Sequence, residues 1–387
     1  MSGEERLRRV VGPLFLILCL GSAYWIAPDF GPYDFHTYHT AGVLLEEGSS
    51  SDAIYNVSFL RNAHKRIHDR AGLGPYFYSP VTLPAARILA FADSAESAVR
   101  MYRVAIFVIL GLVLAGLGVQ SGSWLWPALL ALSYPVQCQF TYNNATPVLT
   151  GLIALFIVGI RAERWFLAGL SLALAMTIKP YVVLFLLPLF LARMFRPILW
   201  TLGASSGAVL VSFAWSTPSA WMAWADQLIT RGAMGIYAIY NNLSVPALIV
   251  RPFSPRVLWV KPIAFGDFPG LPFMLLAALP ALVLVLLLRR KSLREPGFGE
   301  VMIYLLLLSP FTWDHVYLFL LLVPLLYPRL LKTTALLIVP TLFYYPVLQI
   351  LLSRESWTVG LFLLLLYFPL VSIILGWKMK AESQDIQ

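Results

Sequence analysis

The sequence predicts an all-α integral membrane protein, a bundle of helices that crosses the bilayer many times. Two observations predict this fold class. Of the 387 residues, 59% are hydrophobic and only 12% are charged, whereas a soluble domain averages about half apolar and about a quarter charged residues. The apolar residues also form runs long enough to cross about 30 Å of hydrocarbon. The clearest such runs are residues 104–119, 125–140, 273–288 and 358–377.

The first apolar run, Val10–Ile26, follows a basic segment, Arg6–Arg9, in the layout of a signal peptide. We expect a retained membrane anchor instead, because no clean small-x-small cleavage site follows and many further spans come after it. The two cysteines, Cys19 and Cys138, lie inside apolar runs. They are expected to behave as small hydrophobes and indicate no redox compartment.

The positive charges predict the orientation. With a cytoplasmic N-terminus, the short basic connections all lie inside, as the positive-inside rule requires. The inside connections are residues 120–124, which carry no Lys or Arg, the basic segments 161–164, 193–196, 289–294 and 329–332, and the tail with Lys378 and Lys380. The short outside connections then carry only Lys179 and Arg354, and the other cations lie in two long outside loops, Ala27–Arg103 and Ser216–Gly270. Long loops translocate largely regardless of charge. We therefore expect cytoplasmic termini and one membrane domain over residues 1–387.

The net charge of +9 does not indicate a nucleic-acid partner, because most cations sit at the ends of apolar runs, where they mark topology.

Two further runs, Phe166–Leu191 and Val301–Leu326, have basic residues at both ends, so this orientation requires each to enter the membrane and come back. Each is broken near its middle, by Lys179-Pro180 and by residues 309–315. A single kinked crossing is the alternative. Irregular backbone at membrane depth is tolerated only where it lines a cavity or is covered by protein. With these half-length hairpins, about twelve helices are expected.

The first outside loop is expected to contain two helices that lie in the membrane interface. Asp34–Glu47 has apolar residues at helical spacing and ends at Gly48. Ser58–Arg70 is amphipathic, with Phe59, Leu60, Ala63 and Ile67 on one face and Arg61, His64, Lys65 and His68 on the other.

Few residues near the outer surface can carry chemistry, and Asp34 is the first of them. It opens an interfacial helix, so its carboxylate would face the layer where lipid headgroups lie. A helix N-cap is an equally ordinary use of Asp at this position.

Lys179 interrupts a long uncharged stretch. An ammonium at that depth must be paired, snorkel to the interface or lie in a wet cavity, so Lys179 is either a snorkelling cation or an anion-binding group. The segment Trp313-Asp314-His315 places an aromatic ring, an acid and an imidazole at one hairpin tip. An aromatic belt and a helix cap would explain the first two but not His315.

Two Asn pairs, Asn143-Asn144 and Asn241-Asn242, are predicted on outside turns, as is Arg251. Asn is an ordinary turn residue, so each pair taken singly is explained by structure alone. The sequence has no zinc-ligand spacing, nucleotide-binding glycine loop or serine-nucleophile motif. These patterns predict a polar cleft facing outward, but they do not identify a reaction.

Several short motifs, in order along the chain and on one predicted side, resemble polyprenyl-phosphate-sugar-dependent glycosyltransferases of the GT-C class. The chain is most similar to the mannosyltransferases of family 87. The matching motifs are Asp34-Phe-His-Thr-Tyr38-His-Thr-Ala-Gly42, Phe77-Tyr78-Ser-Pro80, Lys179-Pro180, Asn241-Asn-Leu-Ser244 followed by Arg251, and Ser309-Pro-Phe-Thr-Trp-Asp-His315. Two departures are Asn143-Asn144, where the family often has Gly-Gln-x-Asn, and Asn242 in place of Gln.

The resemblance implies transfer of a hexose, with mannose expected, from a polyprenyl-phosphate donor to a lipid-linked or glycan acceptor, with inversion. It also implies a bacterial inner-membrane location with the site on the outer face. Asp34 would be the catalytic base, and Lys179, His315 and Arg251 would bind the donor phosphate. The residues expected at the sugar and acceptor are Tyr38, His39, Tyr78, Asn143, Asn144, Asn242, Trp313 and Asp314.

No cofactor is required by this chemistry, since the donor brings its own leaving phosphate. A divalent cation stays open, although Asp34 and Asp314 alone make a thin site for one. Two other classes of function are compatible with the composition. A lipid or glycolipid transporter would also place cations and broken helices in the membrane, but its polar residues should continue to the cytoplasmic side. A structural subunit of an envelope complex should show no preferred side for its polar residues.

Overall fold

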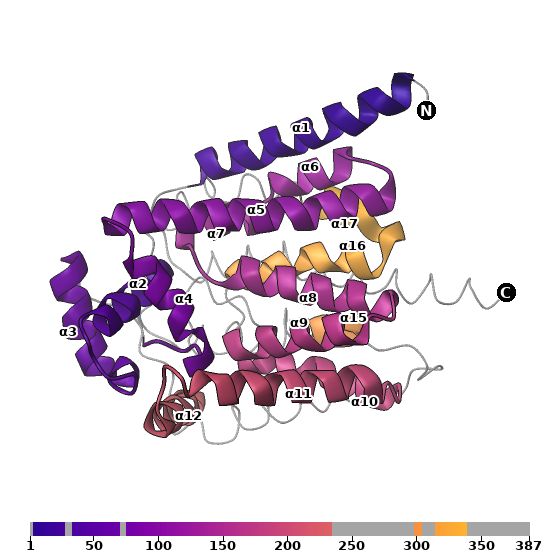
Figure 1. Cartoon of the computed structure of the whole chain (residues 1–387). Coiled ribbons are helices and arrows are strands. Elements are labelled where there is room, and N and C mark those ends of the chain that lie inside the picture. Colours follow the sequence, from indigo (N-terminus) through magenta and orange to yellow (C-terminus); the bar gives the residue numbers. More distant parts are fainter. Residues whose placement is uncertain (1–2, 28–32, 70–74, 234–297, 304–313, 339–387) are drawn as a thin grey trace, which may run out of the picture. The chain divides into compact units, whose positions relative to one another are not determined.

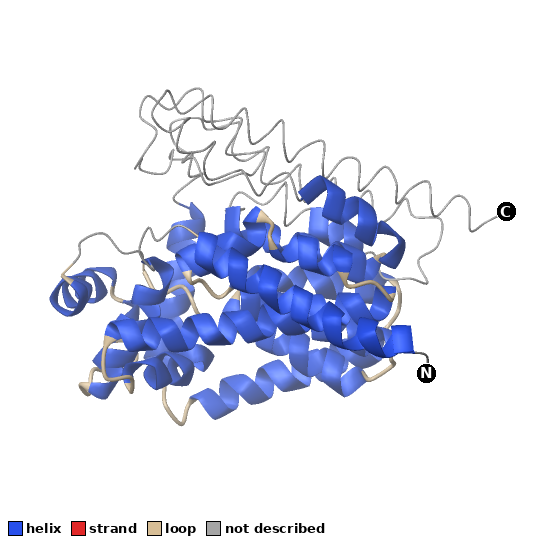
Figure 2. Ribbon diagram, turned by 90° about the horizontal axis from the view of Figure 1, so that it is seen from above, coloured by secondary structure: helices blue, strands red, loops and turns tan. Residues whose placement is uncertain are grey.

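The computed structural model describes residues 3–27, 33–69, 75–233, 298–303 and 314–338 (Figure 1). Figure 2 shows that these described residues form helices and loops, with no strand among them. The all-α prediction is therefore confirmed. The chain divides into two compact units: Met1–Ile26, Gly111–Gln137 and Met234–Gln387 form unit 1, and Ala27–Leu110 and Cys138–Ala233 form unit 2.

Unit 1 contains the N-terminal helix α1 (Gly3–Ile26), which packs against α6 (Leu125–Ala131). Gly12 of α1 lies against the ring of Trp124, because a Cβ there would come within 2.9 Å of the Trp124 Cβ. The other described elements of this unit are α15 (Phe298–Ile303), η7 (Asp314–Leu321), α16 (Leu322–Leu326), η8 (Pro328–Leu330) and α17 (Leu331–Ile338). The predicted runs 273–288 and 358–377 lie outside the described residues.

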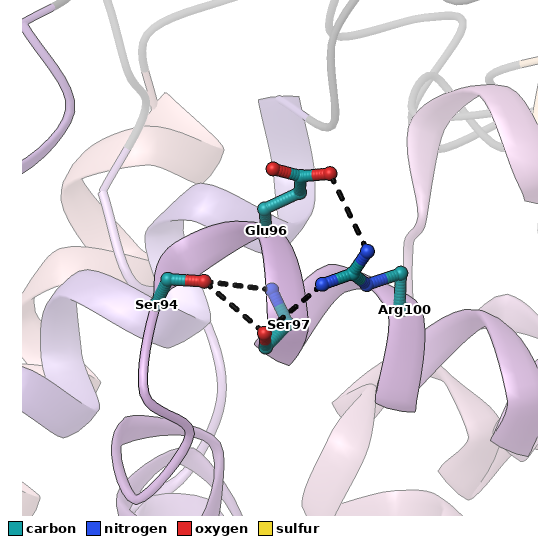
Figure 3. Close-up of polar contacts among 4 residues, drawn as sticks. All are labelled: Ser94, Glu96, Ser97 and Arg100. Carbon is teal, nitrogen blue, oxygen red and sulfur yellow. Dashed lines mark hydrogen bonds and ion pairs between the residues drawn. The ribbon is translucent and has the colours of Figure 1, made fainter.

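Helix α5 (Ala95–Ser121) is, within the described ranges, the one helix long and apolar enough to cross a membrane. It begins well before Val104, where the sequence placed the start of this span. The Ser94 hydroxyl accepts a hydrogen bond from the Ser97 amide at 3.2 Å, and Glu96 pairs with Arg100 at 3.6 Å (Figure 3). These contacts cap and extend the first turn with polar residues. The end of the predicted outside loop is thus helical.

The predicted span 125–140 is wrong as one helix, since it is divided into α6 and α7 (Tyr134–Tyr142). At the break, the Ser133 hydroxyl donates to the Leu130 carbonyl at 2.6 Å. Pro135 follows, and it has no amide proton with which to continue the hydrogen bonds of α6. The break could not be predicted from composition because the residues on both sides of it are apolar.

Unit 2 contains a group of packed helices formed by α8 (Thr146–Arg161), α9 (Trp165–Ile178), η3 (Pro180–Phe185), α10 (Leu186–Leu191) and α11 (Phe195–Ser212). Glycines allow the close packing. A Cβ on Gly159 of α8 would come within 2.9 Å of the Ala168 nitrogen in α9. A Cβ on Gly169 of α9 would come within 2.7 Å of the Thr201 nitrogen in α11.

Within Phe166–Leu191 the chain turns back on itself, as the predicted in-and-back path requires, while its entry into a membrane stays a prediction. Phe166 and Trp200, near the starts of α9 and α11, have ring centroids 5.2 Å apart. At the other ends, the Thr177 carbonyl accepts from the Ser79 amide at 3.3 Å, and the Trp215 indole donates to the Pro80 carbonyl at 3.0 Å. Helices α9 and α11 therefore run parallel, so η3 and α10 must run back between them. The reversal begins at Lys179-Pro180, as the sequence predicts.

A second part of unit 2 is formed by α2 (Tyr33–Glu46), η1 (Ala53–Tyr55), α3 (Val57–His68), η2 (Pro80–Thr82) and α4 (Leu83–Ala90) (Figure 1). Both expected helices of the first loop are present. Helix α2, however, does not lie on a surface, because residues 35–42 are all buried and it packs against α3 and α4. At Gly42 a Cβ would overlap the Ala86 carbonyl group of α4. Helix α2 is therefore covered by neighbouring helices, and its predicted position at the membrane interface stays a prediction.

The predicted faces of α3 also need a correction. His64, assigned to the polar face, is buried together with Leu60 and Ala63, whereas Phe59, assigned to the apolar face, is exposed. The reason is that histidines of α2 and α3 pack against each other, a contact that the amphipathic pattern does not show.

The second predicted outside loop begins with a helix that the sequence analysis missed, α12 (Pro218–Ala233). It packs on η1 and η2. The Gln227 amide donates to the Tyr55 carbonyl at 3.3 Å, so α12 helps to hold the segment in which η1 lies.

Candidate active site

Asp34 lies in the first turn of α2 and is partly buried. Burial raises the pKa of this carboxyl to about 6, and the positive charge of Lys179 opposes the shift. Loss of hydration disfavours the charged form of an acid, while a nearby cation favours it. The two side chains, far apart in the sequence, are thus close enough for their charges to interact. A carboxyl with a pKa near neutrality is suited to accept a proton.

Lys179 lies at the C-terminal end of α9, where the backbone is extended before Pro180. Its ammonium lies over the ring of Tyr78, with the nitrogen 4.7 Å from the ring centroid. This geometry gives a cation–π contact. The sequence analysis offered snorkelling or anion binding for Lys179; in the structure its ammonium lies over an aromatic ring, and its charge lowers the pKa of Asp34.

Tyr38 of α2 and Tyr78 contact each other through their hydroxyl groups, and their rings meet edge to face with centroids 4.9 Å apart. Both side chains are buried. Burial is the main cause that raises the pKa of each phenol above its usual range, and the negative charge of Asp34 adds to it. Both therefore stay neutral hydrogen-bonding groups at physiological pH. The Tyr38 oxygen also accepts from the Ala145 amide at 3.1 Å.

Asn143 and Asn144 form the turn between α7 and α8, as predicted. Asn143 has a φ of 51°, in the left-handed region that Asn tolerates better than most residues. Its carboxamide donates to the Phe140 carbonyl at 3.1 Å and accepts from Arg103 Nε at 3.1 Å. The Tyr102 hydroxyl donates to the Asn144 carbonyl at 2.9 Å. Two residues of α5 thus fix this turn beside Tyr38.

Asn144 is almost wholly buried, and its side-chain oxygen accepts from the Thr146 amide at 2.7 Å. In the part of the chain that the structure describes, its Nδ2 group has no hydrogen-bond partner. A buried amide without a partner is uncommon and requires an explanation.

His39 does not join this group. It lies on the side of α2 that faces α3, where its Nδ1 is 3.4 Å from Nε2 of His68. His36 and His64 belong to the same histidine cluster, with ring centroids 5.6 Å apart. Among the described residues, no three His, Cys, Asp or Glu side chains are arranged to hold a metal ion.

The remaining predicted site residues are not placed by the structure. Asn242, Arg251 and Trp313 lie outside the described residues. Asp314 and His315 begin η7 in unit 1, and their side chains are not described. The structure therefore brings together Asp34, Tyr38, Tyr78, Lys179 and the Asn143-Asn144 turn, all within unit 2.

Sequence reasoning missed Tyr102 and Arg103, which it assigned to the end of the first outside loop. It also missed Trp215, Trp224 and Tyr55, whose side chains hold the segment around Tyr78. The one available signal was the number of aromatic residues in and next to the two loops.

Comparison with known proteins adds the family. The searches of curated proteins and of solved structures found no match. The model of glycosyltransferase family 87 matches residues 76–310, more than half of the chain. The matched range includes Tyr78, the Asn143-Asn144 turn and Lys179, whereas Asp34 precedes it and His315 follows it. The family resemblance predicted from short motifs is thus confirmed by a match over most of the chain's length: this protein is a glycosyltransferase of family 87.

Proposed function

We propose that this glycosyltransferase moves a hexose, with mannose as the expected sugar, from a polyprenyl-phosphate donor to a hydroxyl group of a lipid-linked or glycan acceptor. The acceptor oxygen attacks the anomeric carbon, the bond from that carbon to the phosphate oxygen breaks, and the electron pair leaves with the polyprenyl phosphate. The anomeric configuration inverts. No cofactor is needed in this proposal, because the donor carries its own leaving group.

The observation that carries the proposal is the interaction between the charges of Asp34 and Lys179 beside the Tyr38–Tyr78 pair. An attacking hydroxyl needs a base, and Asp34, with a pKa of about 6, is ionised at neutral pH yet basic enough to take a proton. The proton of the acceptor hydroxyl would pass to the Asp34 carboxylate.

The departing phosphate gains negative charge, so it needs cationic or hydrogen-bonding partners that are in place before the reaction. Lys179 supports this role because its ammonium is already held over the Tyr78 ring. Arg251 and His315 are proposed as further phosphate ligands on the resemblance alone.

Sugar hydroxyls need amide and aromatic partners. The Nδ2 group of Asn144 supports a contact of this kind, because it is buried and has no partner in the described structure. Tyr38 and Tyr78 are proposed to shape the sugar site with their rings, since their hydroxyls already bind each other. The roles of His39, Asn143, Asn242, Trp313 and Asp314 rest on the resemblance.

A membrane location with several spans is part of the proposal. Helix α5 exposes most of its apolar length, which a core helix of a soluble protein would not do. Helix α11, which packs on α9, also exposes apolar side chains, among them Leu199, Leu202, Leu210 and Val211. Contiguous exposed apolar faces suit contact with lipid. The cytoplasmic termini and the outward-facing site remain predictions from the charge distribution.

The test is incubation of the purified protein with radiolabelled polyprenyl-phosphate mannose and, separately, with GDP-mannose, each with candidate lipid and glycan acceptors. We expect transfer from the lipid-linked donor only. Transfer from the nucleotide sugar alone would contradict the proposed donor class. A parallel series with other polyprenyl-phosphate hexoses tests the choice of mannose.

A further inference from the structure

The segment Phe77–Pro80 is fixed at every backbone carbonyl. The Trp224 indole donates to the Phe77 carbonyl at 3.0 Å, and the Tyr55 hydroxyl donates to the Tyr78 carbonyl at 3.0 Å. The Thr82 hydroxyl donates to the Ser79 carbonyl at 2.7 Å, and the Trp215 indole donates to the Pro80 carbonyl at 3.0 Å. The Ser79 amide donates to the Thr177 carbonyl at 3.3 Å. The side chains of Tyr55, Thr82, Trp215 and Trp224, together with the Thr177 carbonyl, thus hold this backbone in one conformation.

The hydroxyl of Ser79 is the exception in this arrangement. Ser79 is 1% exposed, and its Oγ atom has no hydrogen-bond partner in the described part of the chain. The residue precedes η2 as its N-cap, yet its side chain makes no capping hydrogen bond, although Ser at this position normally does. Burying a hydroxyl without a partner costs free energy. Alanine would therefore be more stable here than serine.

The position of Ser79 indicates what its hydroxyl is for. Its amide is bonded to the last turn of α9, two residues before Lys179, and the ring of the preceding residue, Tyr78, lies under the Lys179 ammonium. The backbone hydrogen bonds fix the position from which the Ser79 side chain projects, so its hydroxyl can change partners only by rotation about χ1. Polar groups that are costly to the free protein and fixed in place are characteristic of binding sites.

We propose that Ser79 is a donor-binding residue whose hydroxyl donates a hydrogen bond to a phosphate oxygen of the polyprenyl-phosphate sugar, next to Lys179. This inference rests on the proposed function and adds to it a residue that lies inside the Phe77–Pro80 motif but that the sequence analysis gave no role. Since the hydroxyl has almost no exposed surface, side chains around it must move when the donor binds. Rotamer changes of this kind are common on binding.

The experiment compares Ser79→Ala with a matched control, Ser51→Ala. Ser51 is also buried, but its hydroxyl accepts from the Thr217 amide at 3.1 Å. Binding of a sugar-free polyprenyl phosphate in detergent micelles is measured by quenching of tryptophan fluorescence, and thermal unfolding is followed in parallel. For Ser79→Ala we expect about 10-fold or greater loss of affinity, with an unchanged or higher unfolding temperature. For Ser51→Ala we expect unchanged affinity and a lower unfolding temperature.

An unchanged affinity for the phosphate lipid in Ser79→Ala would overturn the inference, and a lower unfolding temperature would assign the hydroxyl a structural role instead. A loss of affinity confined to the sugar-bearing donor would overturn the phosphate contact in favour of a sugar contact. Failure of the wild-type protein to bind the sugar-free lipid would also overturn it. Binding without sugar transfer would contradict the proposed function and leave the Ser79 contact standing, since the binding arm needs no turnover.

Discussion

Two opposing effects set the pKa of the Asp34 carboxyl group. Burial raises its pKa and the charge of Lys179 lowers it, with a result of about 6. Burial without a nearby cation would keep the carboxyl protonated, so it could not accept a proton. An exposed carboxyl would be ionised but too weakly basic to take a proton from a hydroxyl group. The structure supplies both because the start of α2 and the end of α9 lie near each other.

The substitution Asp34→Asn is expected to lower the turnover rate by about 10²- to 10⁴-fold, the usual contribution of a general base. It should not lower the thermal unfolding temperature at pH 7. A raised pKa means that folding favours the protonated carboxyl, so the stability it contributes below pH 3.8 is lost as the pH rises through about 6. The neutral amide does not suffer this loss.

Turnover and unfolding temperature are measured on the same preparation of Asp34→Asn, with wild-type protein beside it. Full turnover in this variant would remove Asp34 from the mechanism, and a large fall in unfolding temperature would show that the carboxylate has a structural role.

Lys179→Met is expected to weaken donor binding and to move the acid limb of the activity profile. In the wild-type protein, activity should fall as the pH drops below about 6, where Asp34 becomes protonated. Without the lysine charge, the pKa of Asp34 rises further, so activity should fall at a higher pH. Lys179→Arg, which keeps the charge, serves as the control. A pH profile identical to that of the wild type in Lys179→Met would disprove the coupling.

At the scale of elements, the closeness of α2 to α4 decides where Asp34 and Tyr38 lie. Gly42 of α2 is packed against the backbone of α4, and the carbonyl carbon of Ala86 would be 2.7 Å from a Cβ at this position. Backbone atoms cannot rotate away as a flexible side chain can. The family-like Ala-Gly pair at the end of the Asp34 motif is therefore explained by packing, which holds α2 in the position that the site needs.

Gly42→Ala is expected to destabilise the protein by about 1–3 kcal/mol, the usual cost of overpacking, and to reduce turnover with it. Gly207→Ala in α11 is the matched control, since nothing lies within 4 Å of a Cβ there. It should be neutral or stabilising by up to about 1 kcal/mol, because Ala favours a helix over Gly. Thermal unfolding in detergent measures both. Equal effects of the two substitutions would refute the close contact between α2 and α4.

At the scale of the whole molecule, the charge distribution predicts that the first loop faces outward and that the turn between α8 and α9 faces the cytoplasm. Asn62 in α3 and Glu163 in that turn are both exposed, and the two native cysteines are buried. A membrane-impermeant maleimide applied to intact cells should therefore label Asn62→Cys and not Glu163→Cys. Both should be labelled after the cells are opened. Labelling of Glu163→Cys in intact cells would reverse the proposed orientation.

The all-α fold class could be predicted from the sequence because it depends on overall composition and on the lengths of apolar runs, which can be read along the chain. Apolar runs and their lengths indicated helices, and Lys179-Pro180 marked the point where the chain turns back. The break between α6 and α7 and the buried position of α2 could not be predicted in this way. They depend on which neighbours a segment meets, and an apolar run looks the same whether it faces lipid or another helix.

For the candidate site, too, some features could be predicted from the sequence and others only from the tertiary structure. The sequence by itself determined the residue types, namely an acid near the start of a helix, a lysine in an apolar stretch, two tyrosines in separate motifs and an Asn pair, and its motifs indicated family 87. Only the tertiary structure decided that Asp34 and Lys179 interact, that His39 faces the other histidines, and that Ser79 is held rigid with its hydroxyl unused. The physical reason is that burial, charge interaction and unpaired polar groups arise between segments distant in sequence, and no local pattern encodes those distances.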